Sequence, residues 1–108
     1  MGSNTPLAKV SDIPEGKGIV VMSDQGEEIA LFKMNAKIYA INNICPHAGA
    51  SLAEGEVNDC KVSCPRHAWV FDITTGTCIN VPGADVDTYQ LRIVDGFIYL
   101  KPLQTRNE

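Results

Sequence analysis

Cys45-Pro46-His47 and Cys64-Pro65-Arg66-His67 are the two stretches that decide the fold of this 108-residue chain. Sixteen residues separate His47 from Cys64, and the chain contains only two histidines, each close to a cysteine. Two loops that each offer one thiolate and one imidazole can approach a single metal group from two directions, because both side chains are good ligands for iron and zinc. The spacing therefore predicts a metal centre made by Cys45, His47, Cys64 and His67.

The sequence before these stretches predicts β-strands separated by turns. No apolar residues recur at helical spacing over a window of about eleven positions, which favours an all-β fold. Turn-forming residues divide this part at Pro14-Glu15-Gly16 and at Asn35-Ala36-Lys37. We expect strands over residues 7–10, 18–23, 28–33 and 38–41, which form the first half of a sheet.

The C-terminal part predicts a β-hairpin. Tyr89, Leu91 and Ile93 alternate with Gln90 and Arg92, and Asp95-Gly96 separates them from an apolar run at 97–100. An Asp-Gly pair favours the positive φ angles of a two-residue turn. We therefore expect two antiparallel strands joined by Asp95-Gly96.

Residues 43–83 differ in composition from the rest of the chain, because they contain all four cysteines, both histidines and the single tryptophan. We expect this segment to be a smaller metal-binding insert carried by an antiparallel β-sheet base, residues 1–42 and 84–108, in a single domain of residues 1–108. Inside the insert, residues 55–63 and 69–73 are predicted as short strands. Thr75-Gly76 is predicted as a hairpin turn, and Val81-Pro82-Gly83 as a loop that returns to the base.

Charge and hydropathy exclude several classes of function. The net charge is -4 with no long block of either sign, so no basic stripe is present to bind nucleic acid. A mildly acidic protein is attracted to basic surfaces on partner proteins, and the same net charge also keeps a protein soluble. The apolar runs are far shorter than the roughly 20 residues of a membrane span, and the start lacks the pattern of a secretory signal. We expect a cytoplasmic monomer with neither membrane nor nucleic acid as a partner.

Zinc and disulfides are the competing explanations for the cysteines. Structural zinc modules usually pair cysteine with cysteine and histidine with histidine, whereas each half here is mixed. A 2Fe-2S cluster with two thiolates on one iron and two imidazoles on the other fits mixed halves better, and zinc remains the alternative. Four cysteines could also form two disulfides in a secreted chain, but the placement of the histidines argues against this. We expect Cys60 and Cys78 to be reduced, partly buried thiols, and we assign them no role.

The two stretches resemble the ligand boxes of the Rieske family of iron-sulfur proteins, in their residues and in their separation. This resemblance covers most of the chain, since it extends to Leu52-Ala53-Glu54-Gly55, Trp69-Val70-Phe71-Asp72, Thr75-Gly76, the Pro82 loop and the Asp95-Gly96 hairpin. It implies the Rieske fold and one 2Fe-2S cluster, with Cys45 and Cys64 on the buried iron and His47 and His67 on the outer iron. The histidines would then lie at the tip of the protein, near a docked partner, and the Pro82 loop would cover the cluster.

Four positions depart from the respiratory and photosynthetic branch of that family. Ala50 and Arg66 stand where that branch has a second pair of cysteines, which form a disulfide. Trp69 and Phe71 stand where it has a serine and a tyrosine, whose hydroxyls bond to the cluster sulfurs and raise the potential. Fewer hydrogen bonds to sulfur leave the reduced cluster less stabilised. The resemblance therefore implies a low reduction potential.

The resemblance also implies an electron carrier rather than an enzyme. The predicted ligands use both histidines, so neither a nucleophile-base pair nor a second iron site with two histidines is left in the sequence. We expect a ferredoxin that passes single electrons from a flavin reductase to a terminal oxygenase. The small subunit of an NAD(P)H-dependent nitrite reductase is the alternative, and a zinc-stabilised interaction module is the third possibility.

Overall fold

The computed structural model describes residues 5–23, 25–46, 49–65 and 69–101. These ranges contain short strands and two single-turn 3-10 helices, η1 (Val10–Asp12) and η2 (Leu52–Glu54), which are far too short to cross a bilayer. The strands are β1 (Ala8–Lys9), β2 (Gly18–Met22), β3 (Glu28–Met34), β4 (Lys37–Asn42), β5 (Glu56–Asn58), β6 (Lys61–Ser63), β7 (Val70–Asp72), β8 (Thr88–Tyr89), β9 (Leu91–Val94) and β10 (Phe97–Leu100). The all-β prediction is confirmed.

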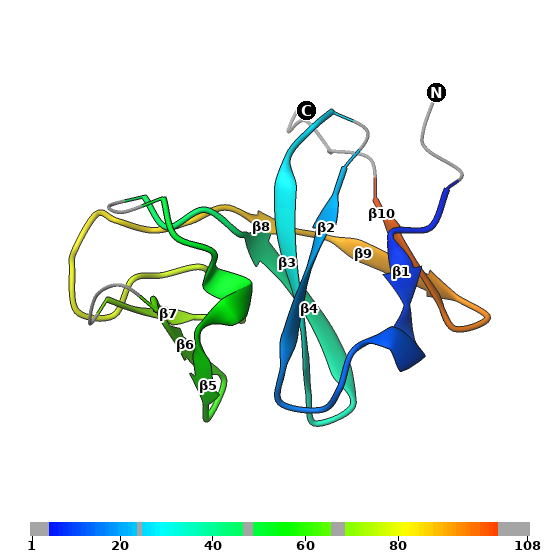
Figure 1. The fold of residues 1–108 in the computed structure, drawn as a ribbon, viewed down its shortest axis with the longest axis horizontal. Helices are drawn as coiled ribbons and strands as arrows, with labels where there is room; N and C mark the ends of the chain where they lie inside the picture. Colours follow the sequence, from blue (N-terminus) through cyan, green and yellow to red (C-terminus); the bar gives the residue numbers. More distant parts are fainter. Residues whose placement is uncertain (1–4, 24, 47–48, 66–68, 102–108) are drawn as a thin grey trace.

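The strands form three small antiparallel sheets that follow one another along the long axis of the molecule (Figure 1). The central sheet has the order β2-β3-β4-β8, and the sheet β1-β10-β9 lies on one side of it. The sheet β5-β6-β7 lies at the opposite end, together with η2 and the long connection before β8. All three strands of this last sheet fall within the predicted insert, and the division of the chain into base and insert remains our proposal.

Strand β3 belongs to both hydrophobic cores of the protein. Its residues alternate between the two faces of the central sheet, so Ala30, Phe32 and Met34 join one core while Ile29 and Leu31 join the other. The first core extends through η2 to β6 and β7, and the second reaches Ile98 of β10. A strand covered on both faces reads as a nearly continuous apolar run, as β3 does.

Two predicted hairpins are confirmed. Strands β3 and β4 are joined at Asn35 and Ala36, which have φ angles of 55° and 64°. The Asp95-Gly96 turn has φ angles of 54° and 81° and pairs Val94 with Phe97. Positive φ at both central positions gives a turn whose twist matches that of the flanking strands.

The segment 55–63, predicted as one strand, is instead a hairpin of β5 and β6. The chain reverses at Asp59 and Cys60, with φ angles of 56° and 66°. Asp59 is a common residue at such a turn, but cysteine is not, because its Cβ disfavours positive φ. Val57 and Val62, on either side of the turn, correctly indicated β-strands. The sequence between them gave no clear signal for the reversal.

The predictions for the ends of the base were wrong in two details. The first strand is only Ala8–Lys9, followed at once by η1, and it pairs with β10 in a separate sheet, whereas one sheet was expected for all four N-terminal strands. The strand predicted around Tyr89, Leu91 and Ile93 is interrupted at Gln90. Its first part pairs with β4 and its second part with β10, so the interruption lets the chain pass from one sheet to another.

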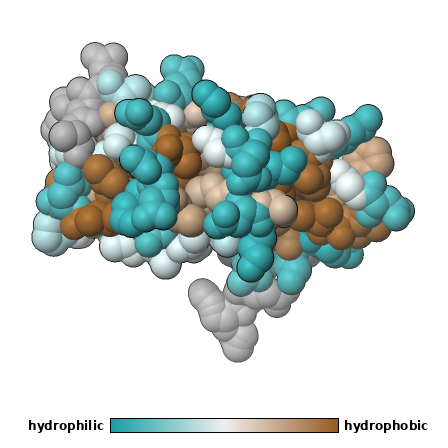
Figure 2. Space-filling view, turned by 90° about the horizontal axis from the view of Figure 1, so that it is seen from below, coloured by the Kyte–Doolittle hydropathy of each residue, from teal (hydrophilic) through white to brown (hydrophobic). Residues whose placement is uncertain are grey.

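Large apolar side chains that remain exposed are distributed over several strands and loops. In the view from below, hydrophilic residues interrupt the hydrophobic ones across the face (Figure 2). Single exposed apolar residues are normal on a protein surface. Those with the greatest exposure among the described residues are Val20, Met22, Ile44, Ile79, Ile93 and Val94.

Candidate metal centre

The first predicted ligand loop begins at Cys45, which is fully buried. The Cys45 N–H donates to the Ala50 carbonyl at 3.0 Å, and the Gly49 N–H donates to the Cys45 carbonyl at 2.8 Å. Gly49 has a φ angle of 69°, which favours glycine at this return point. These bonds close the loop on itself. His47 belongs to it by sequence but lies outside the described residues.

The second predicted ligand loop begins at Cys64, directly after β6, and Cys64 is 3% exposed. The Cys64 N–H donates to the Trp69 carbonyl at 2.8 Å. In both loops, therefore, the cysteine N–H bonds to the carbonyl five residues later. His67 and Arg66 lie outside the described residues. The two loops have the same length and the same closing bond, although their histidines are at different offsets.

The two cysteines belong to one hydrophobic core, which also contains Leu52, Phe71 and Ile73. All four cysteines of the chain are among the described residues, and none of them forms a disulfide. Buried cysteine thiols are the soft ligands that iron-sulfur clusters require, so the burial of Cys45 and Cys64 in one core is compatible with the predicted ligand set. No group of three or more potential metal ligands forms among the described residues, and both histidines of the predicted set lie outside them.

A third loop, residues 79–86, is attached to the same end of the molecule. Ile79 N–H donates to the Val70 carbonyl at 2.7 Å, and Val86 N–H donates to the Gly76 carbonyl at 2.8 Å. The Asp85 carboxylate accepts from Cys78 N–H at 2.9 Å. Val81-Pro82-Gly83, predicted as a loop, contains a turn at residues 82 and 83. That this loop covers the cluster remains a prediction.

The Asp72 carboxylate stabilises the turn that follows β7. The Thr74 hydroxyl donates to the Asp72 carboxylate at 2.6 Å, and Thr74 N–H donates to the same oxygen at 2.8 Å. The Thr74 hydroxyl is the main reason why the pKa of Asp72 lies below its ordinary value. The ionised carboxylate thus stabilises the turn above the ordinary carboxyl pKa, and this contribution is lost as the pH falls through the lowered pKa.

The asparagine pair before the first loop was not recognised from the sequence. The Asn42 side chain accepts from Ile44 N–H at 2.9 Å and donates to the Tyr89 hydroxyl at 3.1 Å. Burial raises the pKa of Tyr89 despite this bond, so the phenol is neutral near pH 7. Asn43 is fully buried and makes a larger set of bonds. The only feature of the sequence that could have indicated the role of Asn42 and Asn43 is their position. They are two polar residues between an apolar strand and a predicted ligand.

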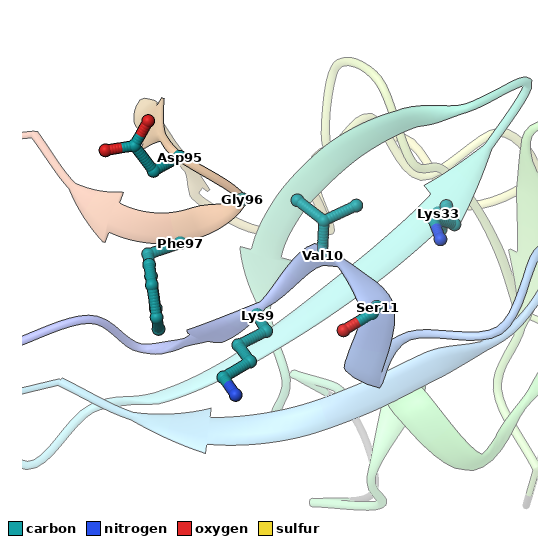
Figure 3. Close-up of a pocket in the computed structure, with 7 residues that line it drawn as sticks. All are labelled: Lys9, Val10, Ser11, Lys33, Asp95, Gly96 and Phe97. Carbon is teal, nitrogen blue, oxygen red and sulfur yellow. The ribbon is translucent and has the colours of Figure 1, made fainter.

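A hollow of about 490 Å³ lies at the other end of the molecule, between β1, η1 and the β9–β10 turn (Figure 3). Cys45 and Cys64, the two predicted ligands that the structure describes, do not line this hollow. Its lining residues are Lys9, Val10, Ser11, Lys33, Asp95, Gly96 and Phe97.

Residues 3–91 match the family model of the Rieske [2Fe-2S] domain. The chain belongs to the Rieske family. A ferredoxin component of naphthalene 1,2-dioxygenase/salicylate 5-hydroxylase systems from Ralstonia is 36% identical to it over 95 residues, which are 87% of this Rieske chain and 90% of the relative.

Two solved structures have similar folds. The Sphingomonas yanoikuyae B1 ferredoxin has a TM-score of 0.85 and 24% identity, with 94% of this chain and all of that chain covered. A putative NADH-dependent nitrite reductase small subunit from Mycobacterium tuberculosis also has a TM-score of 0.85, with 25% identity and coverage of 97% and 99%. The predicted Rieske fold is confirmed, and membership of the family means that the cofactor is a Rieske-type 2Fe-2S cluster.

Gly76→Ala is expected to loosen the third loop. An added Cβ would lie 2.2 Å from the Val86 carbonyl oxygen, at a position where φ is 80°. Gly83→Ala is the matched control, because its φ is 86° but nothing lies within 4 Å of its Cβ position. Gly76→Ala should therefore lower the free energy of unfolding by about 1–3 kcal/mol more than Gly83→Ala. Chemical denaturation followed by circular dichroism measures this difference, and equal losses would contradict the proposed packing of the loop.

Proposed function

We propose that Cys45, His47, Cys64 and His67 hold one 2Fe-2S cluster, and that this Rieske chain is a ferredoxin carrying single electrons from a flavin reductase to a terminal oxygenase. The single observation that carries the proposal is the pair of loops of equal length, each placing a buried cysteine in one core. The 36% identical ferredoxin component from Ralstonia supports the assignment to an oxygenase system. When bound, such a cluster takes up and releases one electron at a time.

The chain's own residues fit a carrier rather than a catalyst. Its only two histidines are part of the proposed ligand set, so the sequence keeps no other imidazole for acid-base chemistry. The two cysteines are held in a water-poor core, and the histidines follow them in the sequence by two and three residues. We propose a diffusible, monomeric carrier in the cytoplasm whose partners perform the reaction on substrate.

The second candidate function is the small subunit of an NAD(P)H-dependent nitrite reductase. The similarity to the Mycobacterium tuberculosis protein, at 25% identity over nearly the full length of both chains, favours it. Affinity purification from the native host separates the two candidates. Recovery of a flavin reductase and an oxygenase supports the ferredoxin, and recovery of a large sirohaem protein supports the nitrite reductase subunit.

The proposed low potential has a structural counterpart in the residues after Cys64. Phe71 is fully buried and Trp69 is half-buried, and neither side chain carries a hydroxyl that could bond to a cluster sulfur. Ala50 closes the first loop with its backbone carbonyl and has no thiol for a bracing disulfide. With fewer hydrogen-bond donors near the cluster sulfurs, the reduced and more negative cluster is less stabilised, which lowers the reduction potential.

The net charge of the chain is concentrated in the part that contains the proposed ligands. Residues 43–87 hold six acidic side chains and two basic ones, while the other residues hold seven of each. Glu54, Glu56, Asp59, Asp85 and Asp87 are all exposed. A charged surface around a redox centre attracts partners of opposite sign and raises the rate of encounter. We therefore propose that the partner proteins present basic faces to this end.

Replacement of the ligands should abolish the cluster. Cys64→Ala is expected to give protein without the iron, the labile sulfide or the paramagnetic signal of a reduced cluster. Cys78→Ala is the matched control, because Cys78 is also 3% exposed and belongs to the same core but lies outside the proposed set. Iron and sulfide analysis with electron paramagnetic resonance gives the result. Zinc in the purified wild-type protein, or equal cluster loss in both variants, would refute the assignment.

The midpoint potential should lie toward the low end of the Rieske range of about -150 to +300 mV. Phe71→Tyr is expected to raise it, because the new hydroxyl can donate to the cluster. Phe97→Tyr adds the same hydroxyl on β10, in a different sheet, and should leave the potential unchanged. A redox titration of the visible absorbance measures all three proteins. A wild-type midpoint well above zero would show that the missing hydroxyls do not decide the potential.

Reversing one charge within the acidic residues 43–87 should change the rate of electron transfer from the reduced protein to small ions. The reduced protein is mixed with hexaamminecobalt(III), a cation, or ferricyanide, an anion, each of which accepts one electron. Glu54→Lys should slow the first reaction and speed the second by roughly threefold at low salt, with a smaller effect at high salt. Glu27→Lys, which changes the net charge equally but lies outside residues 43–87, should have less effect. Equal effects of both variants would mean that only net charge matters.

A further inference from the structure

Asn43 is the fully buried polar residue that stands two positions before Cys45. It directly follows β4 (Lys37–Asn42), at the point where the chain leaves the central sheet for the first ligand loop. A buried amide is costly unless its donors and acceptor are all satisfied, so its partners show what it holds together.

The side-chain bonds of Asn43 reach two separate parts of the chain. Its Nδ2 donates to the Glu28 Oε1 atom at 3.1 Å and lies 2.9 Å from the Ser51 hydroxyl oxygen. Its Oδ1 accepts from Ala53 N–H at 2.8 Å and also lies 3.1 Å from the Ser51 hydroxyl. The backbone donor at Ala53 fixes the orientation of the amide, because a flipped amide would place two donors against each other.

The backbone of Asn43 repeats the same connections. Its N–H donates to the Glu28 carbonyl at 3.0 Å, and its carbonyl accepts from Leu52 N–H at 2.8 Å. One residue thus joins the start of β3 to both ends of the ligand loop, the end that enters at residue 43 and the end that leaves at residues 51–53. The bonds of Cys45 itself, to Ala50 and Gly49, close the loop internally and do not fix its direction relative to the sheet.

We propose that Asn43 is a positioning residue for the cluster, and that it sets where Cys45 stands relative to Cys64 on the second loop. This inference rests on the proposed function, since it requires Cys45 to be a ligand. Cys64 follows β6 of the sheet β5-β6-β7, so the two thiols are carried by different supports. A small rotation of the first loop about its base would change the geometry at the thiolates without unfolding the rest of the domain.

Asn43→Leu tests the proposal, because it keeps the number and branching of the side-chain heavy atoms and removes every hydrogen bond made by the side chain. The rate at which a chelator removes iron should rise by about tenfold, as the loss of several buried bonds implies. The paramagnetic signal of the reduced cluster should broaden as the loop samples several positions. Ile98→Ala is the control, chosen in the second core and compared under conditions that give equal free energies of unfolding.

A rescue variant separates positioning from general destabilisation. Asn43→Asp alone places a carboxylate against Glu28 and should release iron faster than the wild type. Adding Glu28→Gln exchanges donor and acceptor across the same pair, so the double variant should recover most of the wild-type signal width and iron retention. This comparison stands even where Asn43→Leu does not fold.

The outcomes distinguish the inference from the proposed function. If Asn43→Leu matches Ile98→Ala at equal stability, or if Glu28→Gln fails to rescue Asn43→Asp, Asn43 is only a structural residue and the inference is overturned. If the wild-type protein itself contains no 2Fe-2S cluster, the proposed function and the inference fail together.

Discussion

Burial of strand β3 on both faces is the constraint on which the rest of the structure depends. Ala30, Phe32 and Met34 exclude water on the side of the ligand loops, and Ile29 and Leu31 do so on the side of β10. Strand β3 is also paired with β2 on one edge and with β4 on the other, and a buried strand of this kind opens only at a high cost in free energy. The first ligand loop is attached to this strand at Glu28, through Asn43, and therefore takes its position from the best-buried part of the chain.

The two ligand loops are supported by different interactions and are joined by a close backbone contact. The first loop depends on buried polar bonds, whereas the second extends from the ladder of β5, β6 and β7. Gly55 links them, because its N–H donates to the Leu52 carbonyl while its Cα faces the backbone of Ser63, the residue before Cys64. A Cβ at Gly55 would stand 2.0 Å from the Ser63 carbonyl oxygen, so only glycine allows this approach. The distance between the ligand loops is thus set by backbone packing, and the direction of the first loop is set by Asn43.

The sequence was sufficient to predict the all-β class, the Rieske family and two hairpins, because these depend on local signals. Apolar alternation, the Asp95-Gly96 pair and the spacing of Cys45 and Cys64 can each be read without knowledge of the tertiary structure. The reversal at Cys60 and the pairing of β1 with β10 could not be read in this way. At the reversal, Cys60 adopts a positive φ angle that cysteine seldom adopts, so its residue type gives no signal for a turn. The pairing of β1 with β10 joins residues from opposite ends of the chain, which no local pattern indicates. Asn43 escaped prediction for a related reason, since only the fold shows that an ordinary asparagine is buried and fully bonded.

The proposed carrier separates the driving force of electron transfer from the rate of encounter. Its potential depends on donors near the cluster, and the relevant position, Phe71, is fully buried in the core that contains both cysteines. Its encounter rate depends on surface charge, and the acidic side chains of residues 43–87, such as Glu54 and Asp87, are exposed. Because a buried aromatic residue makes no contact with a partner and an exposed carboxylate is screened by water and salt, each property can change with little effect on the other. A Rieske chain of this kind can thus be fitted to a partner with a different surface while its potential stays matched to the same electron donor.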